Sequence, residues 1–113
     1  MDKTLKRKLL KALRSGKYKQ TTNGLREYNK FCVLGVLLDV YDKSKWHLGK
    51  KIDGKLYYNS EWFYGRNNQD TCVPPSIARK IGLKLQDAYT LIDLNDYDQK
   101  TFAEIADWID ENL

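Results

Sequence analysis

The residues best suited to bind a ligand lie in and around a polar segment at 16–20. Lysine and arginine side chains bind phosphate oxygens, a tyrosine ring stacks on a base, and a glutamine amide can read the base edge. An aromatic run at 57–64 could supply a second stacking wall. The candidates in these segments are Arg14, Lys17, Tyr18, Lys19, Gln20, Arg26 and Trp62. They predict a pocket for an anionic, nucleotide-type ligand; in the alternative reading, the lysines are solvated and the aromatics form the core.

A lone cysteine, Cys32, offers a second kind of chemistry. In the first turn of a helix, free backbone N–H groups would lower the pKa of its thiol and favour the thiolate nucleophile. Gln20 could then supply an oxyanion donor, an arrangement loosely like that of papain. The nucleophile also needs a base, and the only histidine, His47, stands in a separate polar stretch. A cysteine-dependent hydrolase or transferase is therefore the alternative function, set against a buried, structural cysteine.

Charge is divided unevenly along the chain, which has a net charge of +5. Residues 1–30 carry ten Lys or Arg against two acids, whereas residues 85–113 carry one lysine against eight acids. One interpretation is that the two ends pack together, with most charges solvated. The other is a basic surface that attracts a polyanion. The acidic end argues against a general duplex-DNA binder, so nucleic-acid binding through a basic helix at 3–14 is the second alternative.

Several classes of protein are excluded by what the sequence lacks. No apolar run reaches the roughly 18–20 residues of a membrane span, and the N-terminus lacks the apolar region of a secretory signal. We therefore expect a cytoplasmic protein in which Cys32 and Cys72 are reduced. One histidine and two distant cysteines do not form a structural zinc site. We predict neither a metal nor a cofactor, and the sequence leaves the oligomeric state open.

The elements that must position these residues begin with two helices. Leucines at 5, 9 and 13 predict an amphipathic helix over 3–15, with Gly16 as its stop. A nearly unbroken apolar run at 31–41 predicts a second helix over about 30–42, with Asn29 as its N-cap. Periodicity alone cannot distinguish this run from a buried strand, but its length favours a helix. Gly35 would allow close approach of a neighbouring segment, so this helix should be the centre of the core.

The second half of the chain adds a sheet and further helices. Asp53-Gly54 suits a hairpin turn, and the aromatic run that follows has strand propensity. We therefore expect a small antiparallel sheet over about 50–65. Helices are predicted from Pro74-Pro75 to Ile81, over 85–95, and from a Thr101–Glu104 capping box to the C-terminus. The prediction is one α+β domain over 1–113, with four or five helices around the central helix.

Several segments together are similar to a family of small, mostly uncharacterised proteins of phages, prophages and bacteria. They are ALRSGKYKQ at 12–20, FCVLGVLLD at 31–39, PP at 74–75, GL at 82–83, LND at 94–96 and FAEIA at 102–106. Members typically read ALRSGKY-Q, then CCLGVLCD and later LND, and the similarity covers most of the chain except about 46–70. Val33 and Leu38 stand where further cysteines are common, which weakens any role for a cysteine cluster. The resemblance implies a viral or mobile-element origin but supplies no reaction.

The LND triplet at 94–96 has two interpretations. Asn95 tolerates the left-handed conformation that closes a helix, and Asp96 can bond to the next turn. Because the triplet belongs to the resemblance, Asn95 and Asp96 are also candidate polar residues of a pocket. The function predicted is that of a non-enzymatic phage or prophage accessory protein. It would act by binding, either sequestering an anionic ligand or blocking a host defence protein in the bacterial cytoplasm.

Overall fold

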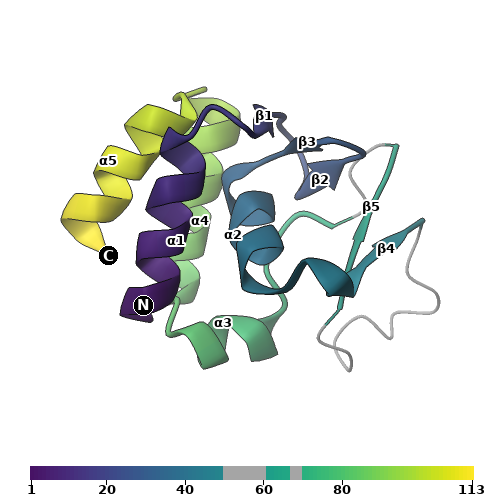
Figure 1. Cartoon of the computed structure of the whole chain (residues 1–113), viewed down its shortest axis with the longest axis horizontal. Coiled ribbons are helices and arrows are strands. Elements are labelled where there is room, and N and C mark those ends of the chain that lie inside the picture. The colour runs from purple at the N-terminus through teal and green to yellow at the C-terminus, as the bar shows by residue number, and fades with distance from the viewer. Residues whose placement is uncertain (50–60, 67–69) are drawn as a thin grey trace.

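The structure is a computed structural model that describes residues 1–49, 61–66 and 70–113. In these residues the chain forms helices packed beside two small sheets, and the α+β prediction is confirmed (Figure 1). The helices are α1 (Lys3–Arg14), α2 (Val33–Asp42), α3 (Pro75–Ile81), α4 (Leu85–Ile92) and α5 (Phe102–Asn112), with a 3₁₀ turn η1 (Lys43–Lys45) and a π-helical turn η3 (Asp93–Tyr97). The strands are β1 (Lys19–Gln20), β2 (Arg26–Glu27), β3 (Lys30–Phe31), β4 (Trp46–Leu48) and β5 (Trp62–Tyr64).

Helix α1 forms where the leucine spacing predicts it. The Asp2 carboxylate caps its first turn, accepting a hydrogen bond from the Leu5 N–H at 2.7 Å. Leucines 5, 9 and 13 are buried. Gly16 follows in a left-handed conformation (φ 75°), which glycine adopts with little strain and which ends the helix.

Helix α2 is the centre of the core, but it begins three residues later than the sequence predicts. Every residue from Val33 to Leu38 is buried, and Cys32 rather than Asn29 is the N-cap. Lys30 and Phe31 are instead strand β3, which pairs with both β1 and β2. The predicted close approach at Gly35 is confirmed, because a Cβ atom there would lie 1.8 Å from the Leu25 carbonyl oxygen.

The two sheets differ from the single antiparallel sheet predicted over 50–65. The first has the strand order β1-β3-β2 and is mixed: β1 pairs parallel with β3, and β2 pairs antiparallel with it. In the second, β5 pairs parallel with β4 at residues 46–48, a pairing that the sequence does not predict. The hairpin turn expected at Asp53-Gly54 lies outside the described residues.

The C-terminal helices follow their local signals. Pro74 precedes α3, and Gly82 ends it with a left-handed φ of 70°. Helix α4 continues directly into the π-helical turn η3, where the Asp98 N–H donates to the Asp93 carbonyl at 2.9 Å. The Thr101–Glu104 capping box is formed at the start of α5, so the predicted final helix is confirmed.

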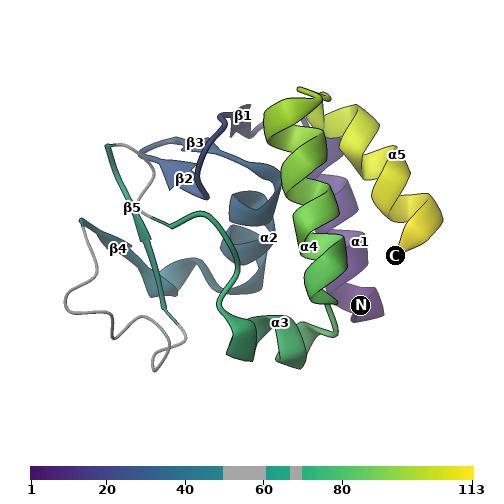
Figure 2. The ribbon, with the colours of Figure 1, turned by 180° about the vertical axis from the view of Figure 1, so that it is seen from behind.

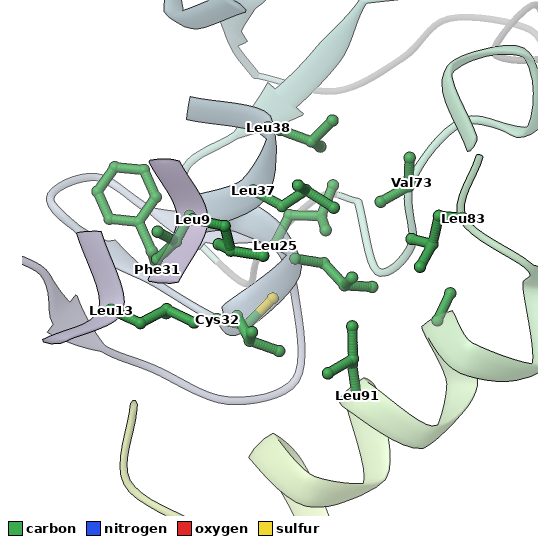
Figure 3. Close-up of a cluster of buried hydrophobic side chains, with 14 of the residues drawn as sticks. Leu9, Leu13, Leu25, Phe31, Cys32, Leu37, Leu38, Val73, Leu83 and Leu91 are labelled. Atoms are coloured by element: carbon green, nitrogen blue, oxygen red, sulfur yellow. The ribbon is translucent and has the colours of Figure 1, made fainter. Parts of the chain in front are cut away.

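The apolar faces of α1 and α4 converge on α2. Figure 3 shows Leu9 and Leu13 of α1, Leu37 and Leu38 of α2, and Leu91 of α4 pointing into one cluster. Helix α5 lies beside α1 (Figure 1), and Arg14 bridges them by ion pairs to Asp107 at 2.9 Å and Asp110 at 3.5 Å. The basic and acidic ends thus pack together. No helix in the described part of the chain is long and apolar enough to cross a membrane.

Candidate functional site

A pocket lined by lysines lies between α1 and the end of α2. Its volume is about 360 Å³. Lys8 and Lys11 come from α1, Lys17 from the loop after it, and Lys43 from η1 after α2. Tyr18, Asp39, Ala12, Ser15 and Val40 complete the lining. We call this the lysine pocket. It combines four ammonium groups with a partly apolar wall and one carboxylate.

Tyr18 and Asp39 form a fixed wall of the lysine pocket. The Tyr18 hydroxyl donates to Asp39 Oδ2 at 2.5 Å, and the Trp46 indole N–H donates to Asp39 Oδ1 at 3.1 Å. Burial and the adjacent Asp39 carboxylate raise the pKa of Tyr18 above its ordinary value, so its hydroxyl stays protonated and keeps donating. The Tyr18 ring packs edge-on against Phe31, with centroids 5.1 Å apart. Both oxygens of Asp39 are thus engaged by Tyr18 and Trp46, and Asp39 is only half-exposed. The four lysines are exposed, so they are the charged groups that a ligand in the lysine pocket would meet first.

Lys17 and Tyr18 line the lysine pocket as predicted from the sequence, whereas Lys8, Lys11 and Lys43 are pocket residues that the sequence did not predict. Lys8 and Lys11 could have been found from the sequence. The 3.6-residue period of a helix puts both on one side of the leucine stripe of α1. Lys43 could not be placed in this way, because it joins the pocket through the packing of α2 against α1. Lys19 is exposed on β1 and is not part of the lysine-pocket lining.

Three other predicted ligand-binding residues have structural roles instead. Arg14 is held by the ion pairs to α5. The Arg26 guanidinium lies over the rings of Phe31, Trp46 and Tyr64, at 4.8, 5.1 and 4.0 Å from their centroids, which is cation–π geometry. Trp62 has no exposed surface, so it packs in the core and cannot stack on a ligand.

Gln20, Asn95 and Asp96 meet in a separate hydrogen-bond network. Asn95 is 1% exposed. Its amide donates to the Thr21 carbonyl at 2.9 Å and to Asp96 Oδ1 at 2.8 Å. Its Oδ1 accepts from Gln20 Nε2 at 2.9 Å and from the Val33 N–H at 3.1 Å. This side chain therefore joins η3 to β1 and to the first N–H of α2. Its amide nitrogen and its amide oxygen each make two hydrogen bonds, so the buried Asn95 side chain has no unpaired polar atom.

This network corrects one interpretation and supports another. Asn95 lies inside the π-helical turn, and the left-handed residue that follows the helix is Gln99 (φ 51°). The helix-closing role predicted for Asn95 is therefore wrong. Gln20 and Asn95 do line a second, polar pocket of about 270 Å³ together with Thr21 and Lys100. Since both amides are already hydrogen-bonded within the protein, this pocket is better suited to holding the fold than to binding an anion.

Cys32 does not have the environment of a nucleophile. It is 4% exposed, and its Sγ accepts a hydrogen bond from the Gly35 N–H at 3.4 Å. Burial raises the pKa of the Cys32 thiol to about 12 and outweighs the hydrogen bonds from the helix N-terminus, so the predicted lowering of this pKa is wrong. Gln20 points to Asn95, and His47 pairs with Glu61 at 3.0 Å. Both side chains are thus engaged by partners other than Cys32.

Comparison with known families matches the whole chain, residues 1–113, to the family described as a domain of unknown function (DUF8296). The chain belongs to this family. Neither a curated protein nor a solved structure matches it. The function must therefore be argued from the two pockets, the buried cysteine and the surface charges.

Proposed function

We propose that this protein is a non-enzymatic accessory protein of phage or prophage type that binds an anionic, nucleotide-type ligand in the lysine pocket. The proposed origin rests on the sequence resemblance, and the ligand class rests on the chemistry of the pocket. Acting in the bacterial cytoplasm, the protein would withdraw such a ligand from a host defence system. Binding alone is sufficient for this role, so no catalytic group is required.

The observation that carries the proposal is the gathering of four lysines from three segments around one pocket. Lys8 and Lys11 stand three residues apart on α1 and so share one side of it. The loop and η1 bring Lys17 and Lys43 to the same space. Like charges held together repel one another, and a multivalent phosphate relieves that repulsion by bringing opposite charge.

A neighbouring pocket offers space for the organic part of the ligand. Its volume is about 200 Å³, and it shares Lys8 and Val40 with the lysine pocket. Tyr41 and Ile81 give it apolar surface, and Thr4 gives it a hydroxyl. A nucleotide with phosphates among the lysines could therefore place its ring beside Tyr41, with Lys8 between the two parts.

The environment of Cys32 is the reason for preferring binding to catalysis. A buried thiol that is protonated at neutral pH is a poor nucleophile. The enzyme alternative would also need a base, and His47 is engaged with Glu61 on the second sheet. A binding protein needs neither group.

Calorimetric titration with ATP and with inorganic tripolyphosphate tests the proposal. We expect both to bind the wild-type chain, with affinity that falls as salt is added. The double variant Lys11→Ala/Lys17→Ala should lose about 100-fold in affinity for both, since each lost phosphate contact is worth roughly tenfold. Lys19→Ala is the matched control, because Lys19 is an exposed lysine of the same region outside the lysine pocket.

The results that would contradict the proposal are equally definite. If neither compound binds, the pocket does not hold polyphosphates. If Lys19→Ala costs as much affinity as the double variant, binding reflects general positive charge rather than the lysine pocket.

A further inference from the structure

A row of exposed side chains runs along α4 and η3. Leu85 is 57% exposed, Tyr89 is 53% exposed and Tyr97 is 79% exposed. With the exposed Asp93, they occupy positions 85, 89, 93 and 97, each four residues after the one before. Residues four apart are neighbours on a helix surface, so these four side chains form a continuous row. We call it the α4 ridge.

The π-helical turn keeps the row together. In a regular α-helix, positions four apart drift steadily around the axis, because one turn takes 3.6 residues. The wider turn at Asp93–Tyr97 offsets this drift and holds Tyr97 near the line of Tyr89. Such wide turns occur frequently at functional sites.

The inner face of α4 is used by the core, whereas the ridge is not. Ala88 and Leu91 are the buried residues of α4, and this helix packs against α2. In Figure 1 α1 lies in front of α4, and in the reverse view of Figure 2 α4 lies in front of α1. The two helices thus cover opposite faces of the molecule, so the α4 ridge lies away from the lysines that α1 contributes to the lysine pocket.

Aspartates outnumber lysines along the ridge, where the exposed Lys84 and Lys100 stand only at its two ends. Between residues 85 and 99 the sequence has four aspartates and neither a lysine nor an arginine. The aspartates are Asp87, Asp93, Asp96 and Asp98. An acidic surface repels nucleic acid and anionic lipid, and it attracts positively charged protein segments.

We propose that the α4 ridge is a docking surface for a protein partner that presents a positively charged segment with apolar side chains. Tyrosines dominate binding energy at many interfaces because they bury a large rigid surface and retain a hydroxyl for hydrogen bonding. Tyr89 and Tyr97 supply the anchors, Leu85 extends the apolar contact, and the aspartates select a basic partner. This surface is independent of the anion site, and both can be occupied together.

The test uses the isotope-labelled full chain and a short synthetic peptide of arginines and leucines with one tryptophan. We expect backbone NMR shifts to change at residues 85–98 as the peptide is added. Tyr89→Ser/Tyr97→Ser should weaken binding at least tenfold. Tyr28→Asn is the matched control, because Tyr28 is 51% exposed in the turn between β2 and β3 and asparagine tolerates its positive φ of 52°. Binding of tripolyphosphate to the lysine pocket should be unchanged in the double variant.

Four outcomes would overturn the proposal. The peptide could fail to bind, or its shifts could map away from the ridge. A matched peptide with glutamate in place of arginine could bind equally well. Sedimentation velocity could show that the wild-type chain self-associates and that Tyr89→Ser/Tyr97→Ser abolishes this, in which case the occupant of the ridge is a second copy of the chain.

Discussion

The side-chain Oδ1 of Asn95 accepts a hydrogen bond from the backbone N–H of Val33 at 3.1 Å, across 62 positions of sequence. This contact gives the first residue of α2 a partner for an N–H that the helix itself leaves unpaired. Through Gln20 and Thr21 the same side chain also holds β1. The loop that carries Lys17 and Tyr18 precedes β1, so the Asn95 network positions one wall of the lysine pocket indirectly.

Replacing Asn95 should therefore destabilise the fold. Asn95→Ala leaves the Val33 N–H and the Thr21 carbonyl without their buried partner, and each such loss costs about 1–3 kcal/mol. We expect the free energy of unfolding, measured with urea, to fall by about 2–6 kcal/mol. Asn112→Ala is the control, because Asn112 is exposed and donates only to its own helix at Trp108. Equal losses in the two variants would contradict a special role for Asn95.

Gly35 should tolerate no side chain. A Cβ atom at this position would meet the Leu25 carbonyl oxygen at 1.8 Å and its carbon at 2.8 Å, and backbone atoms cannot move aside as a flexible side chain can. Gly35→Ala should cost more than about 3 kcal/mol in the free energy of unfolding or prevent folding.

The comparison for this variant is Gly16→Ala. Gly16 has open space around its Cα but a positive φ of 75°, so alanine there should cost only about 1–2 kcal/mol of backbone strain. A Gly35→Ala protein as stable as Gly16→Ala would show that α2 and the Leu25 segment are not packed as closely as the structure has them.

Cys32 should resist thiol reagents in the folded protein. Burial raises the pKa of its thiol to about 12, above the ordinary value of 9.0, and only the deprotonated thiolate reacts, which is the minor form at a pH below the pKa. At pH 8 the thiolate fraction is therefore about 1,000-fold smaller than for a free thiol, and burial adds a barrier to access.

The Cys72→Ser variant allows Cys32 to be measured alone. We expect no labelling by a thiol reagent at pH 8 until denaturant unfolds the chain, and full labelling afterwards. Fast labelling of the native variant would revive the cysteine-nucleophile alternative. Cys32→Ala should bind tripolyphosphate as the wild-type protein does.

The capping box at Thr101 makes part of the stability depend on pH. Hydrogen bonds from the Thr101 N–H and hydroxyl group lower the pKa of Glu104 below its ordinary value of 4.5. A lowered folded-state pKa contributes stability above the unfolded-state value, and that contribution is lost as the pH falls through the folded-state value.

An NMR titration of the Glu104 carboxyl group measures this directly. We expect a midpoint below 4.5 in the wild-type protein and a higher midpoint in Thr101→Ala. Thr101→Ser keeps the hydroxyl group and should keep the low midpoint. The same midpoint in all three proteins would mean that the capping box is not formed in solution.

The sequence predicts those elements whose signals are local. The leucine stripe and Gly16 define α1, Pro74 and Gly82 bound α3, and the capping box begins α5. The sequence does not predict the elements that form only by pairing with distant segments. Lys30 and Phe31 became a strand because β1 and β2 flank them, and no periodicity of residues 30–42 contains that information.

The same division applies to the site. Lys17 and Tyr18 were predicted from their residue types and their place after a helix. Arg26 was misassigned because the rings that surround it include Trp46 and Tyr64, which only folding brings near. The sequence predicts a helix-closing role for Asn95 because the partners that show its actual role, Gln20, Thr21 and Val33, lie more than sixty residues earlier.

Native mass spectrometry of the protein purified from bacterial lysate would show whether the lysine pocket carries a ligand in the cell. We expect the wild-type chain and Lys19→Ala to carry a phosphate-containing small molecule, and Lys11→Ala/Lys17→Ala to carry none. Fragmentation of the released molecule would identify it. A wild-type protein that carries nothing, or a bound molecule that the double variant retains, would contradict the claim that the lysine pocket binds a nucleotide-type ligand.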